Sequence, residues 1–232
     1  MNHKTKTFDL RTLVIMSMLC AISYVLTVMI RLPISSLPFL KYDPKDIVIV
    51  LGGLILGPLP AFMLSLVVSL IEMVSISDSG IIGLIMNVLS TCSFACLASF
   101  IHKKRPGLKN MFLGVIAGFI AATCVMMLWN YILTPIYTGN PRSEVAQILI
   151  PIILPFNLIK NAINASLIML LYTPLFKAIH ALNLAPSNSF YNNKNTDTNL
   201  SKSRKFGTGV IIFAILTLIT CILAVLAIKG II

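Results

Sequence analysis

Apolar runs of about 20 residues follow one another along almost the whole chain, and each is long enough to cross a membrane as a helix. In hydrocarbon every backbone polar group must be bonded internally, so these runs are expected to be α-helices. Hydrophobic residues make up 57% of the 232 residues and charged residues only 11%, which excludes an ordinary soluble protein. We therefore predict an all-α, polytopic membrane protein with no room for a soluble catalytic domain.

The predicted spans divide the chain into three parts. Residues 1–182 are expected to form a six-helix, substrate-binding membrane domain. Its helices are expected at Thr12–Ile30, at two places within Pro44–Met73, and at Gly80–Ile101, Asn110–Tyr137 and Ile148–Ile179. The second run is divided because Gly57, Pro58 and Pro60 favour a tight turn. Residues 183–206 form a polar cytoplasmic linker, and residues 207–232 contain a predicted seventh transmembrane helix.

The net charge of +11 indicates an orientation in the membrane rather than a nucleic-acid partner, because the basic residues lie in short clusters beside the apolar runs. If the N-terminus is cytoplasmic, the 18 Lys and Arg residues divide into twelve inside, five outside and Lys160 within the membrane. This bias predicts a multi-pass protein of the cell membrane with a cytoplasmic N-terminus. Residues 31–46 become an external loop, and Arg31 is interpreted only as a topogenic charge.

A polar stripe interrupts the sixth apolar run. Asn157, Lys160, Asn161 and Asn164 follow the spacing i, i+3, i+4, i+7, which places them on one helical face. A lysine at the centre of a membrane helix costs about 3 kcal/mol by insertion scales. A chain that tolerates this cost is expected to bind something polar on that face.

Other polar residues are predicted to lie at the same depth. Asn87 and Asn130 fall in the outer halves of neighbouring spans, and the external loop adds Lys41, Tyr42 and Asp43. A single membrane asparagine has a simpler explanation, an interhelical hydrogen bond worth about 0.6 kcal/mol. The clustering favours a binding pocket that is open to the outside and closed to the inside.

Three further interpretations concern charged residues near this pocket. Lys160 could pair with Glu72 or Asp46 as well as contact a ligand. Glu72 and Asp78 could simply be interfacial. Buried acidic residues of the kind used in ion relays are nearly missing.

Catalytic and nucleotide-binding motifs are absent from the sequence. It contains no GxxxxGK[ST], HExxH or GxSxG pattern, and its three histidines fall outside the predicted pocket. The five cysteines lie in apolar segments and are interpreted as packing residues, so no metal site or cofactor is predicted. Because no repeated halves are visible either, the chain is expected to be a capture subunit energised by a partner, not an enzyme.

Four segments carry a resemblance to a known family. They are KYDPKDIVIVLGGLILGP (Lys41–Pro58), GIIGLIMN (Gly80–Asn87), WNYILTPIY (Trp129–Tyr137) and PFNLIK (Pro155–Lys160). Together, over about residues 10–180, they resemble the riboflavin-specific substrate-binding S components of energy-coupling factor (ECF) transporters.

The resemblance implies a six-helix protein that binds riboflavin from outside with high affinity. It also implies two kinds of partner, a transmembrane coupling protein and two cytoplasmic ATPases. Asn130, Asn157 and Lys160 match family positions that hydrogen-bond the flavin, and Leu40–Asp46 would help to cover it. The following residues complete the expected binding set: Leu40, Lys41, Tyr42, Asp43, Asn87, Tyr131, Asn161 and Asn164. The small residues Ser17 and Ala21 match the family's coupling-protein interface.

Other functions stay open on the sequence alone. The chain could be an S component for another vitamin, such as thiamine or folate, although its single Trp argues against a thiamine-type aromatic cage. A self-sufficient secondary transporter would work without an ATPase partner. An intramembrane enzyme is the least supported alternative because no catalytic residues can be named.

Overall fold

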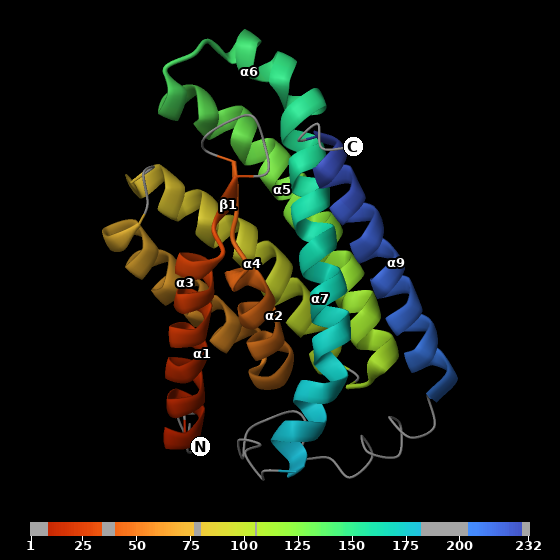
Figure 1. Cartoon of the computed structure of the whole chain (residues 1–232). Coiled ribbons are helices and arrows are strands. Elements are labelled where there is room, and N and C mark those ends of the chain that lie inside the picture. The colour runs from red at the N-terminus through yellow and green to blue at the C-terminus, as the bar shows by residue number, and fades with distance from the viewer. Residues whose placement is uncertain (1–8, 34–39, 77–79, 105, 182–203, 229–232) are drawn as a thin grey trace.

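The computed structural model describes residues 9–33, 40–76, 80–104, 106–181 and 204–228, and these form a bundle of long helices (Figure 1). The helices are α1 (Leu10–Met29), α2 (Lys45–Leu56), α3 (Pro58–Ser75), α4 (Gly80–Lys104), α5 (Leu108–Thr138), α6 (Arg142–Ile148), α7 (Leu154–Ala181) and α9 (Arg204–Ile228), with a π-helical turn η1 (Leu149–Ile153) before α7. Two short strands, β1 (Leu32–Pro33) and β2 (Lys41–Tyr42), pair antiparallel with Leu32 opposite Tyr42. The all-α prediction is confirmed.

Six helices in the described part of the chain are long and apolar enough to cross a membrane. They are α1, α3, α4, α5, the continuous run through α6, η1 and α7, and α9. Helix α2 has only 12 residues, or about 18 Å, which is shorter than a bilayer core of about 30 Å. The second predicted helix therefore exists but does not span.

The division of the second apolar run falls where the sequence predicted. Helix α2 ends at Leu56, Gly57 has a φ of 105°, and α3 begins at Pro58. Glycine is favoured at this φ because it has no Cβ, and proline fits the first turn of the following helix. The chain thus reverses within the bundle between α2 and α3.

Helix α2 lies at the centre of the bundle, in contact with α1, α3, α4 and α7. Eleven of its twelve residues are buried, and Gly53 lies so close to α3 and α4 that a Cβ there would come within 2.3 Å of the Ser99 hydroxyl and 2.7 Å of the Ala61 Cβ. As a result Lys45 and Asp46 begin a helix inside the bundle and are 0% and 1% exposed. Their assignment to an external loop was therefore wrong.

Glycines also bring α4 and α5 together. A Cβ at Gly114 would lie 2.7 Å from the carbonyl oxygen of Ala98, and one at Gly118 would lie 2.7 Å from that of Phe94. Small residues four apart are the usual means of close helix approach in membranes. This packing aligns the ends of α4 and α5 that carry Asn87 and Asn130.

Helix α9 packs along α7 and touches α5, on the opposite side of the bundle from α1 (Figure 1). One face of α9, with Val210, Ala214 and Cys221, is buried, and the rings of Phe112 and Phe213 meet edge to face at 5.9 Å. Its position matches the predicted seventh helix, and its insertion in a membrane stays a prediction. Most of the predicted linker, 183–206, lies outside the described residues.

Candidate substrate-binding site

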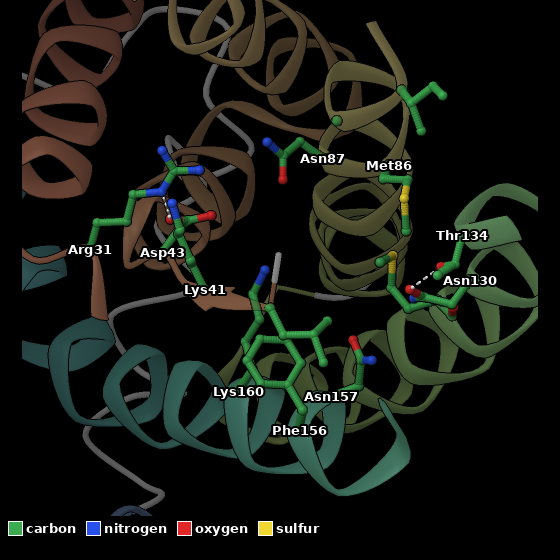
Figure 2. A pocket seen from close by; sticks show the side chains of 14 residues that line it. Arg31, Lys41, Asp43, Met86, Asn87, Asn130, Thr134, Phe156, Asn157 and Lys160 are labelled. Atoms are coloured by element: carbon green, nitrogen blue, oxygen red, sulfur yellow. Dashed lines mark hydrogen bonds and ion pairs between the residues drawn. The ribbon is translucent and has the colours of Figure 1, made fainter. Parts of the chain in front are cut away.

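A cavity of about 80 Å³ lies at one end of the bundle, between the hairpin β1–β2 and helices α4, α5 and α7 (Figure 2). The α4 residues come from its first eight residues, the α5 residues from its last four turns, and the α7 residues from its first two turns. The cavity is lined by Arg31, Leu40, Lys41, Asp43, Ile82, Gly83, Met86, Asn87, Met126, Asn130, Thr134, Phe156, Asn157 and Lys160. Polar groups from separate spans therefore converge at one depth, as the sequence predicted.

Asn130 and Asn157 line the cavity without joining one helix to another. The Asn130 amide donates to the carbonyl of Met126 at 2.7 Å, and that of Asn157 donates to the carbonyl of Ile153 at 2.9 Å. Both bonds stay within one helix, and Thr134, which donates to Asn130 at 3.1 Å, is also on α5. Among the described residues, neither side chain therefore makes the interhelical hydrogen bond that is the simpler explanation for a membrane asparagine.

The other two stripe asparagines do make such bonds. Asn161 donates to the Thr123 hydroxyl of α5 at 3.1 Å, and Asn164 donates to Asp46 of α2 at 3.3 Å. Neither lines the cavity. The stripe on α7 thus divides into two cavity residues, Asn157 and Lys160, and two residues that hold helices together.

Among the described residues, ion pairs lie at three places around the cavity. Lys160 Nζ lies 3.3 Å from Asp46 Oδ2, Arg31 Nε lies 3.4 Å from Asp43 Oδ1, and Lys45 is bonded to Glu72. Of the two partners considered for Lys160, the structure selects Asp46. Glu72 is only 3% exposed and also accepts a bond from Asn87 at 3.3 Å, so its interpretation as an interfacial residue was wrong.

Asp46 is the most connected of the three carboxylates. Besides Lys160 and Asn164, it accepts a 2.6 Å bond from the Thr91 hydroxyl of α4. Its position in the first turn of α2 adds the favourable field of a helix N-terminus. A buried carboxylate needs this number of partners because isolated charges are costly to bury. Three helices, α2, α4 and α7, are thereby fixed to one another near the cavity.

Tyr42 connects the hairpin to this network. Its hydroxyl donates to Asn164 Oδ1 at 2.9 Å, and its side chain is buried with Leu40 and Phe156. Burial, and then the nearby carboxylates of Asp46 and Asp43, raise the pKa of the Tyr42 phenol above its ordinary value. Tyr42 therefore stays a neutral donor and lies behind the cavity wall rather than in it.

Most of the predicted site residues meet in the structure. Those that line the cavity are Leu40, Lys41, Asp43, Asn87, Asn130, Asn157 and Lys160. Tyr131 does not, because it follows Asn130 by one position and lies on another face of α5, where it is 41% exposed. Asp78 falls outside the described residues.

Sequence reasoning missed several lining residues. Arg31 is more than a topogenic charge, since it reaches the cavity, pairs with Asp43 and donates to the carbonyl of Ile76 at 2.6 Å. Thr134, four residues after Asn130, could have been found from helical spacing. Phe156 and the methionines at 86 and 126 carried no signal that separates them from packing residues. The expected scarcity of buried acidic residues was also wrong, because Asp43, Asp46 and Glu72 are all buried.

Ser17 and Ala21 lie elsewhere, exposed on α1. They border a groove of about 390 Å³ between α1 and α3, together with Leu13, Met16, Cys20, Tyr24, Met63, Leu64, Val67 and Ile71. The two small residues leave this face of α1 open to close approach by another helix.

Within the described residues, no three His, Cys, Asp or Glu side chains are grouped as a metal site would require. Helices long enough to span a membrane surround a buried polar cavity lined by amides and charged side chains, which is the arrangement of a membrane protein with a binding site. A family model described as "ECF transporter, substrate-specific component" matches residues 11–172, and the chain belongs to this family. It is therefore an S component and not an enzyme, and membership implies an ECF energising module as its partner.

Several known proteins are similar to this chain. The riboflavin transporter RibU of Staphylococcus aureus is 32% identical, over 71% of this chain and 90% of its own length. The riboflavin transporter FmnP of Bacillus subtilis is 29% identical, over 71% of this chain and 92% of its own. The solved structure reported as "Structure and mechanism of the S component of a bacterial ECF transporter" covers 73% of this chain and 97% of that one, with 29% identity and a TM-score of 0.63.

Proposed function

We propose that this S component captures riboflavin from the extracellular side for an ECF importer. The observation that carries the proposal is the pair Asn130 and Asn157, whose buried amides line the cavity and, within the described part of the chain, bond only inside their own helical run. Riboflavin has a ring edge with hydrogen-bond donors and acceptors and a hydroxylated chain, which suit amides and Lys160. The names of the similar transporters support the same ligand.

The apolar part of the cavity suits the flavin ring. Leu40, Ile82 and Phe156 supply apolar surface, and Met86 and Met126 are flexible side chains that can repack. The cavity of about 80 Å³ is smaller than ligand sites of about 300–1,000 Å³. Binding therefore requires these side chains to move apart and enlarge it.

The bound vitamin would be passed on through the implied partners. In this proposal the α1 face with Ser17 and Ala21 docks on the transmembrane coupling protein, and two cytoplasmic ATPases supply the energy. The orientation that fits the distribution of Lys and Arg has a cytoplasmic N-terminus and the cavity towards the outside.

Purified protein tests the proposal most directly. We expect flavin to co-purify from cells, and the stripped protein to quench flavin fluorescence on titration with nanomolar-class affinity. Thiamine and folate, as competitors, should leave the quenching unchanged. Protein that carries no flavin and does not quench it would refute the proposal, and displacement by another vitamin would assign that vitamin instead.

A further inference from the structure

One of the three ion pairs differs from the others in where its charges lie. Arg31 and Asp43 both line the cavity, so their charges offset each other at its surface. Lys45 and Glu72 both lie behind it. The third pair places a cation, Lys160, on the wall and its carboxylate, Asp46, behind the wall.

Asp46 is held in that position by neutral donors as well. Thr91 donates to Oδ1 at 2.6 Å, and Asn164 donates to Oδ2 at 3.3 Å. Asp46 is 1% exposed, so water screens its negative charge less than at the surface, and the charge acts on Lys160 at 3.3 Å. The carboxylate thus offsets the charge of Lys160. It also leaves fewer of the three N–H groups of the ammonium available to a ligand.

We propose that Asp46 is a specificity-determining residue, which adapts the cavity to an uncharged ligand by neutralising Lys160 from behind. The inference rests on the proposed function, because it concerns the discrimination between riboflavin and its phosphorylated form, flavin mononucleotide. With the Asp46 carboxylate 3.3 Å away, Lys160 can donate a hydrogen bond to a hydroxyl or carbonyl group but presents little net charge to a phosphate. Without the carboxylate, the same ammonium would attract the phosphate.

The size of the effect follows from the Coulomb energy. At about 10 Å and an effective dielectric constant of about 20, removing one charge changes the affinity by about tenfold for each negative charge on the ligand. A phosphate monoester carries between about one and two such charges at neutral pH, so tenfold is the lower bound. The affinity for riboflavin, which is neutral, would not be changed by this Coulomb interaction. A purely structural role for Asp46 would instead change the affinity for both flavins together, because they share the ring and the ribityl chain.

The test is the ratio of the two dissociation constants, measured by fluorescence quenching on full-length protein in detergent. We expect Asp46→Asn to shift this ratio by at least about tenfold towards flavin mononucleotide. Thr91→Val is the matched control, since it removes a hydrogen bond from the same carboxylate and leaves the charge. It should change both constants by the same factor and keep the ratio of the wild type.

A reciprocal variant keeps the test decisive if Asp46→Asn does not fold. Lys160→Gln removes the cation and leaves Asp46, so the ratio should move towards riboflavin. A ratio unchanged in whichever of the two variants folds, while the wild type binds riboflavin, would overturn this inference alone. A wild type that binds neither flavin would refute the proposed function, and this inference with it.

Discussion

Lys160 Nζ, in the second turn of α7, lies 3.3 Å from Oδ2 of Asp46 in the first turn of α2. This ion pair joins the polar stripe on α7 to α2, a central helix that is too short to span a membrane. It explains how a membrane helix accommodates a lysine, since the charge is neutralised within the protein instead of facing lipid. It also means that Lys160 cannot be changed without consequences for Asp46.

We predict that Lys160→Met lowers stability, although it removes a charge from a membrane helix. Breaking a buried pair costs roughly 3 kcal/mol because the remaining carboxylate is left without its cation. The double variant Lys160→Met with Asp46→Asn should recover much of this loss. Thermal unfolding in detergent measures the difference, and equal melting temperatures for the single and double variants would contradict the coupling.

The two neighbouring residues Asn130 and Tyr131 give a matched pair for testing the site. Asn130→Ala removes an amide that lines the cavity and should weaken riboflavin binding by about tenfold, as expected for a lost hydrogen bond in a buried site. Tyr131→Ala changes an exposed side chain and should leave the affinity near that of the wild type. Calorimetric titration of both variants decides, and the opposite order of effects would show that the pocket has been misplaced.

Substituting the glycines that join α4 and α5 should destabilise the bundle. In Gly114→Val the new Cβ would meet the Ala98 carbonyl at 2.7 Å, and overpacking of this kind costs about 1–3 kcal/mol. Gly209→Val is the control, because nothing lies within 4 Å of a Cβ at that position on α9. Thermal melting should separate the two variants, and a similar stability for both would count against close α4–α5 packing.

The proposed coupling face predicts a loss of transport without a loss of binding. Ser17→Trp places a large ring on the groove between α1 and α3, where close helix approach is expected. Ile22→Trp, also exposed on α1 but outside the groove, is the control. Both variants should bind riboflavin, and only Ser17→Trp should fail in cellular uptake. Normal uptake by Ser17→Trp would exclude this face.

The orientation can be tested by chemical labelling in intact cells. In a background without the native cysteines, a membrane-impermeant maleimide should label Glu144→Cys, which is exposed on α6 at the cavity end. Lys104→Cys, exposed at the other end of α4, should react only after the cells are opened. The reverse pattern would place the N-terminus and the cavity on the opposite sides to those proposed.

Helix positions could be predicted well because each depends on local composition. The apolar runs coincide with α1, α3, α4, α5, α7 and α9. The Gly57–Pro58 turn lies where the glycine and proline residues predicted it. The depth of α2 could not be predicted in the same way. Its 12 residues are as apolar as a spanning segment, and only contacts with α1, α3, α4 and α7 reveal that it lies wholly inside the bundle.

The binding site also combines features that the sequence predicts with features that only the tertiary contacts reveal. The sequence by itself determined that Asn157, Lys160, Asn161 and Asn164 share one buried face, because helical spacing fixes direction. Only the tertiary structure decided which of them line the cavity, since that depends on whether Asp46 and Thr123 from other helices reach the same face. Periodicity within one helix carries no information about the helix that packs against it, and the partner of each polar side chain decides whether it binds a ligand or holds the fold together.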